Sequence, residues 1–277
     1  MAAMLDSKFT VGCDPEVFIV DETGRPVSAE GLIPGTKEEP YRVPFGAIQV
    51  DGMAAEFNID PVNTFDDFRH HIRSVLQTMK DMLPTGYAFL IKPSVVFDEE
   101  VWKKTPLKAK ELGCMPDFNA WTASINPPPR NYDMPTLRTA AGHIHIGWTK
   151  DADLSDVNHI VNCNDLVKQL DWYLGGWSVP HDQDGAIRRS LYGKAGACRY
   201  KDYGVEYRVL SNFWLVDDTV METVWDRLVS AITQMSSTFI PELSSMKYNK
   251  RLIKMIETSI IDDQLMSNYH YPLIDVR

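Results

Sequence analysis

Four short stretches of the sequence place acidic, imidazole or guanidinium side chains at alternate positions. Residues two apart in a strand share a face, so each stretch predicts a strand with one polar and one hydrophobic face. A half-exposed sheet without chemistry also alternates in this way, but its wet face is usually rich in Thr, Ser and Lys. The acids, imidazoles and guanidinium groups found here favour a functional site. They are Asp14, Glu16, Glu56, His143, His145, Glu206 and Arg208.

Such a polar face predicts a divalent metal ion. Carboxylates that converge without cations between them repel one another, and a divalent metal relieves that repulsion. Oxygen-rich ligands with one or two imidazoles suit Mg²⁺ or Mn²⁺, which accompany nucleotide phosphates. Zinc is disfavoured because no cysteine joins the set. The pair His143 and His145 alone is a weak signal, shared by cupins, zinc hydrolases and ordinary core histidines.

A segment rich in Arg and Lys, residues 188–201, precedes the strand that holds Glu206. Its cations and its two glycines suit it to hold phosphate or carboxylate oxygens at close approach. The alternative is a solvated basic loop. The closeness of the segment to Glu206 in the sequence favours the functional interpretation.

The elements that position these residues are predicted by hydrophobic periodicity and turn signals. The expected strands are Phe9–Val20, two around Asp51-Gly52 within Ala47–Ile59, Gly86–Val96, Thr139–Trp148, and two around Asp202-Tyr203-Gly204 within Ala195–Leu210. The expected helices run from an N-cap at Thr64 to about Leu83, from a cap at Ser155 to about Leu174, and over Asp217 to about Ile261 with a break near Pro241. The Pro-rich segment 106–138 should be largely irregular and border the site. This order predicts an α+β fold.

Composition limits the classes of function. The 277 residues are 44% hydrophobic, enough for one large core, and no repeat or linker divides them. We expect one catalytic domain over residues 1–277, with a helical C-terminal part at about 217–261. The net charge of −10 argues against nucleic acid as a partner, and neither a membrane span nor a signal peptide is expected. Four scattered cysteines predict reduced thiols in the cytoplasm, the host's if the protein is phage-encoded.

Several motifs in order give the sequence a family resemblance. GCDPEVFIVD, VDGMAAEFNIDP, GCMPDFNAWT, AAGHIHIGW and RRSLYGKAGACRYKDYGVEYRVLSNFW extend over residues 12–214. They resemble the phage-type carboxylate-amine ligases of the glutamine synthetase and glutamate-cysteine ligase superfamily. The resemblance implies a curved, mainly antiparallel sheet with helices on one side. It also implies ATP, Mg²⁺ or Mn²⁺, a carboxylate and an amine as ligands, and an acyl-phosphate intermediate.

The resemblance also assigns roles to residues. It implies Asp14, Glu16, Glu56, His143 and Glu206 as metal ligands, and His145 as a residue that faces phosphate. Arg188, Arg199 and Arg208 would hold the transferred group or the substrate carboxylate, and Asp51 or another acid would take the amine proton. Arg189, Lys194 and Lys201 would bind the nucleotide. Two departures stand out: Asp14 replaces the usual Glu, and the spacing of Asp51 and Glu56 does not map cleanly.

Other functions stay open on the sequence alone. A guanidino-type kinase on the same fold would stop after phosphoryl transfer, a hydrolase could use His143 and His145, and a non-catalytic phage protein could keep only the fold. Asp117 could lie near the acceptor or anchor a turn. Tyr192, Tyr200 and Tyr203 could stack on adenine or pack, whereas His70 and His71 are expected on a helix surface. A homo-oligomer is possible, since active sites in glutamine synthetase lie between subunits.

Overall fold

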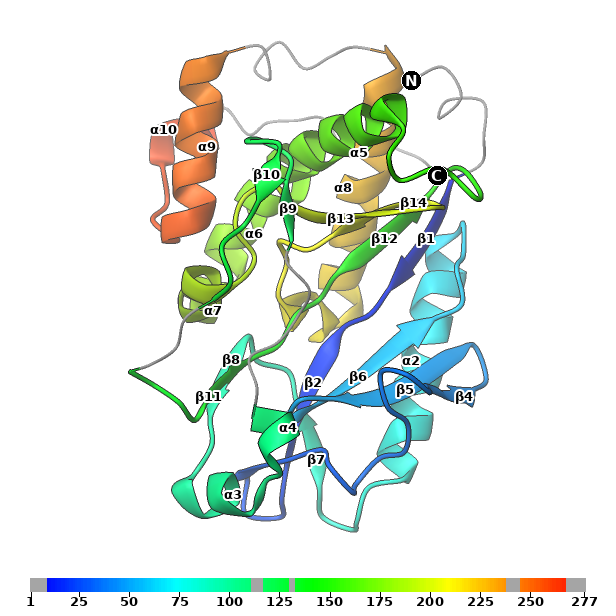
Figure 1. Ribbon diagram of the computed structural model, residues 1–277, viewed down its shortest axis with the longest axis vertical. Coiled ribbons are helices and arrows are strands. Elements are labelled where there is room, and N and C mark those ends of the chain that lie inside the picture. The colour runs from blue at the N-terminus through cyan, green and yellow to red at the C-terminus, as the bar shows by residue number, and fades with distance from the viewer. Residues whose placement is uncertain (1–8, 111–116, 130–132, 238–244, 268–277) are drawn as a thin grey trace.

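The computed structural model describes residues 9–110, 117–129, 133–237 and 245–267. Figure 1 shows its strands and helices in order along the chain. The strands are β1 (Thr10–Cys13), β2 (Glu16–Val20), β3 (Pro26–Val27), β4 (Tyr41–Val43), β5 (Gly46–Asp51), β6 (Ala54–Ile59), β7 (Ala88–Leu90), β8 (Ser94–Val96), β9 (Phe118–Asn119), β10 (Ser124–Ile125), β11 (Leu137–Thr139), β12 (Ile144–Gly147), β13 (Ala197–Lys201) and β14 (Gly204–Tyr207). The α-helices are α2 (Phe65–Asp81), α3 (Glu99–Lys104), α4 (Leu107–Lys110), α5 (Val157–Leu170), α6 (Gly176–His181), α7 (Ala186–Leu191), α8 (Asp218–Ser237), α9 (Met246–Thr258) and α10 (Asp263–Ser267). A π-helix η1 (Asp171–Gly175) joins α5 to α6, and two 3₁₀ turns are η2 (Gln183–Gly185) and η3 (Asn212–Leu215).

The strands form antiparallel sheets. One has the order β1-β12-β14-β13-β9-β10, a second has β3-β2-β6-β5-β4 with β7 also paired to β2, and β11 pairs with β8. Both larger sheets mix consecutive and distant strands, as expected for an α+β protein. The predicted α+β class with mainly antiparallel strands is confirmed.

The two larger sheets meet where β1 passes into β2. The sequence predicted one strand over Phe9–Val20, but it is interrupted at Asp14 and Pro15 because proline has no N–H to donate to a ladder. Before the break the chain pairs with β12, and after it the chain pairs with β6. Asp14 therefore lies at the junction of the two sheets.

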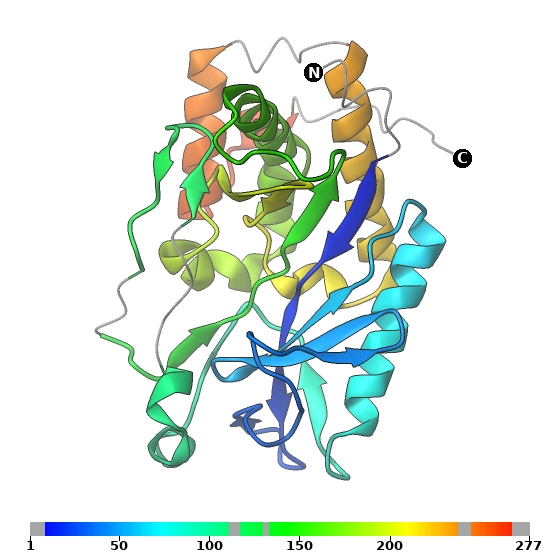
Figure 2. The same cartoon turned by 45° about the vertical axis from the view of Figure 1, so that its right-hand side comes forward.

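The longest helices pack together on one side of the strands. α2 contacts β5, β6 and α8, while α5 contacts β13, β14 and α8, an arrangement visible from two directions (Figures 1 and 2). Thr64 caps α2 as predicted, because its hydroxyl accepts the Asp67 N–H at 3.2 Å. The cap predicted at Ser155 is wrong: Asp156 caps α5 by accepting the Asn158 N–H at 3.0 Å.

Other predicted elements are shorter than expected. Pro93 separates β7 from β8 within the predicted strand Gly86–Val96, and Thr139–Trp148 splits into the end of β11 and β12. The helical C-terminal segment is present as α8 and α9, and Pro241 lies outside the described residues. Cys13, Cys163 and Cys198 are buried free thiols, and Cys114 also lies outside the described residues. Within the described residues, none of the helices has the length and apolar character to cross a membrane.

Candidate active site

A cavity of about 640 Å³ opens at the junction of the two sheets. Two groups of side chains line it, which we call the imidazole cluster (Asp14, His143, His145 and Glu206) and the acidic cluster (Glu16, Asp51 and Glu56). Asp117, Arg188, Arg199, Lys201 and Arg208 also line the cavity. The polar faces of the four predicted strands therefore converge on a single space.

Strand register aligns these residues. In the first sheet Gly12 pairs with His145, His145 with Glu206, and Glu206 with Arg199. In the second, Gln49 pairs with Glu56 and Glu56 with Glu16. Because directly paired residues point to the same face of a sheet, each sheet presents one continuous polar row to the cavity.

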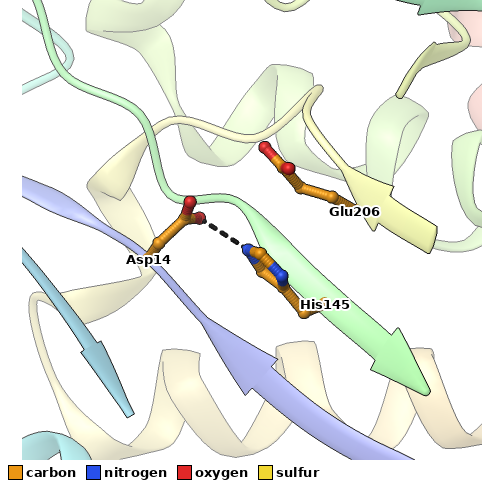
Figure 3. A group of neighbouring side chains, drawn as sticks. All are labelled: Asp14, His145 and Glu206. Carbon is orange, nitrogen blue, oxygen red and sulfur yellow. Dashed lines mark ion pairs between the residues drawn. The ribbon is translucent and has the colours of Figure 1, made fainter. Parts of the chain in front are cut away.

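Three residues of the imidazole cluster, Asp14, His145 and Glu206, bring their donor atoms close together (Figure 3). One donor atom from each of Asp14, His145 and Glu206 lies within 4.8 Å of the others. The distance from Asp14 Oδ1 to His145 Nε2 is 3.0 Å, and to His143 Nδ1 it is 3.3 Å. His143 Nδ1 also lies 3.5 Å from Glu206 Oε1. Both imidazoles thus lie close to the Asp14 carboxylate, and His143 also lies close to that of Glu206.

Opposite charges decide the protonation of this cluster. Burial raises the pKa of Asp14, but His145 and His143 outweigh burial and hold that pKa well below its usual range. Burial and Asp14 raise the pKa of Glu206, but Arg208 and the histidines lower it to about 2. Burial lowers the pKa of His145, yet Asp14 raises it above its ordinary value. For His143, burial and Arg208 together lower the pKa.

In the acidic cluster the pKa values of Glu16 and Glu56 are raised, whereas those of Asp14 and Glu206 are lowered. Burial and the neighbouring Asp51 raise the pKa of Glu16 to about 7, although the Ala141 N–H donates to Glu16 Oε2 at 2.9 Å. Burial, Asp14 and Glu16 raise the pKa of Glu56 well above its ordinary value. Lys37 Nζ lies 3.3 Å from Asp51 Oδ2, and the Arg188 guanidinium acts against the rise in the Glu16 pKa. Carboxylates held in this way attract a further cation.

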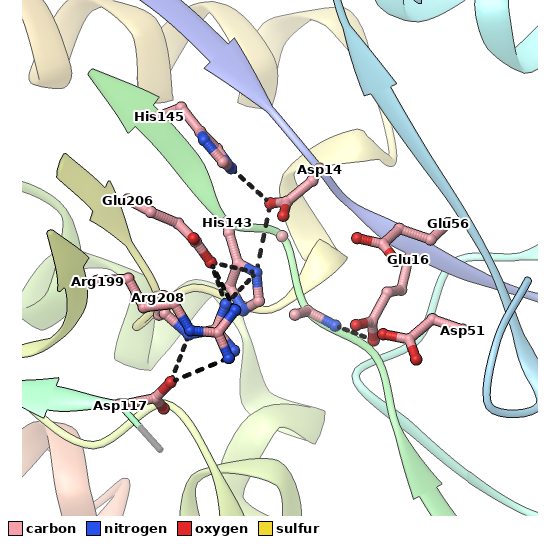
Figure 4. Close-up of polar contacts among 12 residues, drawn as sticks. Asp14, Glu16, Asp51, Glu56, Asp117, His143, His145, Arg199, Glu206 and Arg208 are labelled. Carbon is pink, nitrogen blue, oxygen red and sulfur yellow. Dashed lines mark hydrogen bonds and ion pairs between the residues drawn. The ribbon is translucent and has the colours of Figure 1, made fainter. Parts of the chain in front are cut away.

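A network of cations joins the imidazole cluster to Asp117 (Figure 4). Arg208 Nε donates to Asp117 Oδ1 at 2.6 Å, and its Nη1 donates to Glu206 Oε1. Arg199 Nη1 lies 3.7 Å from Glu206 Oε1, and Lys201 Nζ lies 2.9 Å from Glu206 Oε2. Glu206 is therefore surrounded by positive charge on both of its oxygens.

The basic segment is divided between the cavity and the core. Arg199 and Lys201 point into the cavity from β13, and Arg188 lines it from α7, donating to the Val209 carbonyl at 2.8 Å. Arg189, predicted to bind the cofactor, is instead buried beside Asp182, whose Oδ2 lies 2.8 Å from Arg189 Nη2. Arg188 and Arg189 point in different directions because neighbouring residues on a helix are about 100° apart.

Lys194 also departs from the prediction. It lines a separate hollow of about 50 Å³ beside Pro127–Pro129, not the main cavity. Gly193 and Gly196, which enclose Lys194 and Ala195, have φ angles of +69° and +75° and turn the chain here.

The imidazole cluster fits a divalent ion. Asp14 Oδ1 and His145 Nε2 are buried and neither has a hydrogen-bond partner, although they lie 3.0 Å apart. The other ring nitrogen, His145 Nδ1, contacts the Tyr203 hydroxyl, a second contact typical of metal-binding histidines. The resemblance assigned the metal to His143 and phosphate to His145. In the structure His145 Nε2 belongs to the close donor group, and His143 Nδ1 lies 3.3 Å from Asp14 Oδ1. Oxygen and imidazole donors of this kind suit Mg²⁺ or Mn²⁺.

Several lining residues escaped the sequence analysis. Gln49 donates to Glu56 Oε2 at 2.6 Å, and Lys37 comes from a loop with no motif. A signal existed for Gln49, since it lies two residues before Asp51 and shares its face. Among the tyrosines, Tyr192 and Tyr203 line the cavity, whereas the ring of Tyr200 stacks on Phe118 with centroids 4.7 Å apart.

The remaining residues singled out by the sequence have clear places. His70 and His71 lie on α2 and pack around the ring of Phe45, with centroids 4.8 and 4.7 Å away. They do not line the cavity. Asp117 lies at the cavity wall and contacts Arg208, so it is more than a turn residue.

Comparisons with known proteins give one family. Residues 137–252 match the family model described as Phage phiEco32-like COOH.NH2 ligase-type 2. The resemblance to phage-type carboxylate-amine ligases predicted from the motifs is confirmed over this part of the chain. The matched range contains His143, His145, Glu206 and Arg208, whereas Asp14 and the acidic cluster precede it.

Two solved structures resemble the chain at low identity. A bifunctional glutathione synthetase from Pasteurella multocida is 10% identical with a TM-score of 0.40, over 97% of this chain and 47% of that one. A structure titled novel glutamine synthase homolog is 12% identical with a TM-score of 0.42, over 97% of this chain and 68% of that one. The chain thus spans about half the length of the glutathione synthetase. A search of the curated proteins finds no match.

Proposed function

We propose that this protein is a carboxylate-amine ligase that uses Mg-ATP. The family match over residues 137–252 supports a carboxylate-amine ligase. The observation that carries the proposal is the convergence of Asp14, His145 and Glu206 donor atoms within 4.8 Å, in a cavity shared with a second set of carboxylates. A pair of cation sites flanked by arginines suits the transfer of a phosphoryl group.

Metal ions would be held on both sides of the cavity. Asp14, His145 and Glu206 would hold one, with His143 beside them, and Glu16 and Glu56 would hold another. Bound there, divalent ions neutralise phosphate charge that would repel an approaching carboxylate. The low pKa of Asp14 and of Glu206 keeps both ionised at neutral pH.

The chain's cations would orient the reacting groups. Arg199, Lys201 and Arg208 form one positive wall, and Arg188 lies beneath it with its Nη2 3.3 Å from the Arg208 carbonyl. These groups would bind the oxygens of the transferred phosphoryl group and of the substrate carboxylate. Fixing both reactants in one cavity converts their encounter into an intramolecular step.

The proposed reaction has two steps. A substrate carboxylate oxygen attacks the γ-phosphorus of ATP, the bond to the β-phosphate oxygen breaks, and ADP leaves. The amine nitrogen then attacks the acyl carbon, the C–O bond to phosphate breaks, and phosphate leaves. Asp51 is our candidate to accept the proton that the amine loses, since it lies at the cavity wall beside Lys37.

Trapping the activated carboxylate tests this proposal. Protein, Mg-ATP and a small-molecule extract of the host cell are incubated with hydroxylamine, and hydroxamates are detected by mass spectrometry. We expect a hydroxamate with the wild type and none with Glu206→Gln, because the neutral amide cannot replace the carboxylate as an anionic ligand.

Each alternative outcome points to another function. ADP release without a hydroxamate would favour the guanidino-type kinase. Neither product, with ATP intact, would contradict the ligase and favour a binding role. The Asp66→Asn variant is the matched control for Glu206→Gln, because Asp66 is an exposed acid on α2 and should leave the products unchanged.

A further inference from the structure

Arg208 contacts two carboxylates, that of Glu206, which belongs to the close donor group, and that of Asp117, which does not. Its Nε donates to Asp117 Oδ1 at 2.6 Å, while its Nη1 contacts Glu206 Oε1 and lies 3.2 Å from His143 Nδ1. All of these side chains are buried. Asp117 is thus held at one end of the guanidinium group and Glu206 at the other (Figure 4).

Arg208 and a divalent metal ion would compete for the Glu206 carboxylate. The oxygen that Arg208 contacts, Oε1, also faces His143, and Glu206 belongs to the donor group with Asp14 and His145. A divalent cation on this carboxylate and the guanidinium charge would repel one another across a few ångströms in a buried site. Metal binding at Glu206 therefore favours movement of Arg208 Nη1 away from it.

Asp117 is placed to keep Arg208 in the cavity during that movement. Its contact uses Nε, the guanidinium nitrogen bonded to the aliphatic chain. The guanidinium group is planar and turns as a unit, so a small rotation about the Cδ–Nε bond displaces the Nη groups more than Nε and can leave the Asp117 contact in place. The backbone around Asp117 is fixed: its carbonyl accepts the Asn126 N–H at 2.8 Å, and the Asn119 side chain donates to the Ala195 carbonyl at 3.1 Å. These bonds hold Asp117 directly before β9, at the base of the β9–β10 hairpin.

We propose that Asp117 is a positioning residue that competes with Glu206 for Arg208, so that Glu206 is released to a divalent metal and the Nη groups of Arg208 turn toward an anionic substrate. This inference rests on the proposed metal site. It differs from a simple turn-anchoring role because it couples Asp117, which lies outside the metal donor group, to metal affinity.

Mn²⁺ binding measures the competition directly. The affinity is determined by calorimetry and by the electron paramagnetic resonance of free Mn²⁺, without nucleotide. We expect Asp117→Asn to weaken Mn²⁺ binding by about 10-fold, the lower end of effects from residues behind a metal ligand. The reason is that the loss of the Asp117 charge strengthens the contact of Arg208 with Glu206, which disfavours metal binding to the same carboxylate.

A second substitution should reverse the loss. In Asp117→Asn/Arg208→Gln the competing guanidinium is gone, and Mn²⁺ affinity should return to at least the wild-type value, although turnover stays lost. Arg208→Gln alone should bind Mn²⁺ at least as tightly as the wild type, which tests the competition even if Asp117→Asn folds poorly. Asp182→Asn is the matched control, since Asp182 and Arg189 form a buried pair at 2.8 Å outside the cavity lining. It should lower thermal stability without changing Mn²⁺ affinity.

The outcomes separate this inference from the proposed function. Unchanged Mn²⁺ affinity in folded Asp117→Asn would overturn the inference and leave the metal site intact. Equal weakening in Asp117→Asn and the double variant would also overturn it, because Asp117 would then act only through local structure. If the wild type binds no Mn²⁺, the metal site of the proposed function fails, and the inference fails with it.

Discussion

At the scale of single residues, Asp14 and Glu16 show how two neighbouring acids acquire opposite properties. They are two residues apart and line the same cavity. Asp14 meets two imidazoles, which overcome burial and lower its pKa, whereas Glu16 is buried beside Asp51 and its pKa rises to about 7. The break at Pro15 makes this difference possible, because it directs the two side chains to different clusters.

The raised pKa of Glu16 predicts a pH-dependent stability when metal is removed. Below the unfolded pKa both states are protonated, and between that value and about 7 only the unfolded state is ionised. The stability contribution is therefore complete at low pH and is lost as pH rises toward 7, by at most about 1.4 kcal/mol per pH unit. Urea unfolding from pH 4.5 to 8 in EDTA measures it.

Glu16→Gln provides the comparison for this measurement. The free energy of unfolding of the variant should fall less as pH rises, because its side chain cannot ionise. In the wild type, Mg²⁺ should reduce the fall by favouring the ionised carboxylate. Parallel pH profiles for the two proteins in EDTA would contradict the assigned pKa.

At the scale of elements, the buried carboxylate of Asp171 ties the π-helix η1 to the sheet. It accepts the Trp121 indole N–H at 2.6 Å, the Gly196 N–H at 2.7 Å and the Tyr207 hydroxyl at 2.8 Å. These donors come from β14, from the turn before β13 and from the loop after β9. The carboxylate thereby fixes the start of β13, the strand that carries Arg199 and Lys201.

Removing one donor tests this connection. Tyr207→Phe should lower the free energy of unfolding by about 1–3 kcal/mol, because a buried acceptor loses one of its hydrogen bonds. Denaturant unfolding of the purified variant measures the change. Tyr41→Phe is the control, since Tyr41 is half exposed on β4 and should change stability little. Equal stability of Tyr207→Phe and the wild type would show that Asp171 does not depend on this bond.

At the scale of the whole molecule, the cavity exists because two sheets meet at an angle at the break between β1 and β2. The first sheet contributes the imidazole cluster and the second contributes the acidic cluster. Each sheet is backed by helices, with α5 behind β13 and β14 and α2 behind β5 and β6. Both clusters thus rest on packed elements, a condition for precise ligand geometry.

Divalent metal should therefore stabilise the whole fold. A ligand that binds only the folded state at 100 times its Kd adds about 2.7 kcal/mol, which raises Tm by several degrees in a protein of this size. We expect Mn²⁺ to raise Tm of the wild type by roughly 5–10 °C and that of Glu16→Gln/Glu206→Gln by far less. Differential scanning calorimetry with Na⁺ at matched ionic strength as control measures this. Equal shifts in both proteins would place the stabilising metal elsewhere.

The sequence by itself selected several of the residues that line the cavity. Alternation in the four strands was enough to select Glu16, Glu56, His145 and Glu206, because a strand period of two requires no knowledge of the partner strand. The hairpin around Asp51 and the cap at Thr64 also followed from local chemistry, since turn and cap residues act within a few positions.

The tertiary structure decided how these residues are grouped. Register between distant strands placed Glu206 opposite His145 and Arg199, and Glu56 opposite Glu16. The tertiary structure also brought Asp117 to Arg208 across 91 residues. Ion pairs of this kind depend on which charged groups meet after the chain has folded, and no local pattern contains that information.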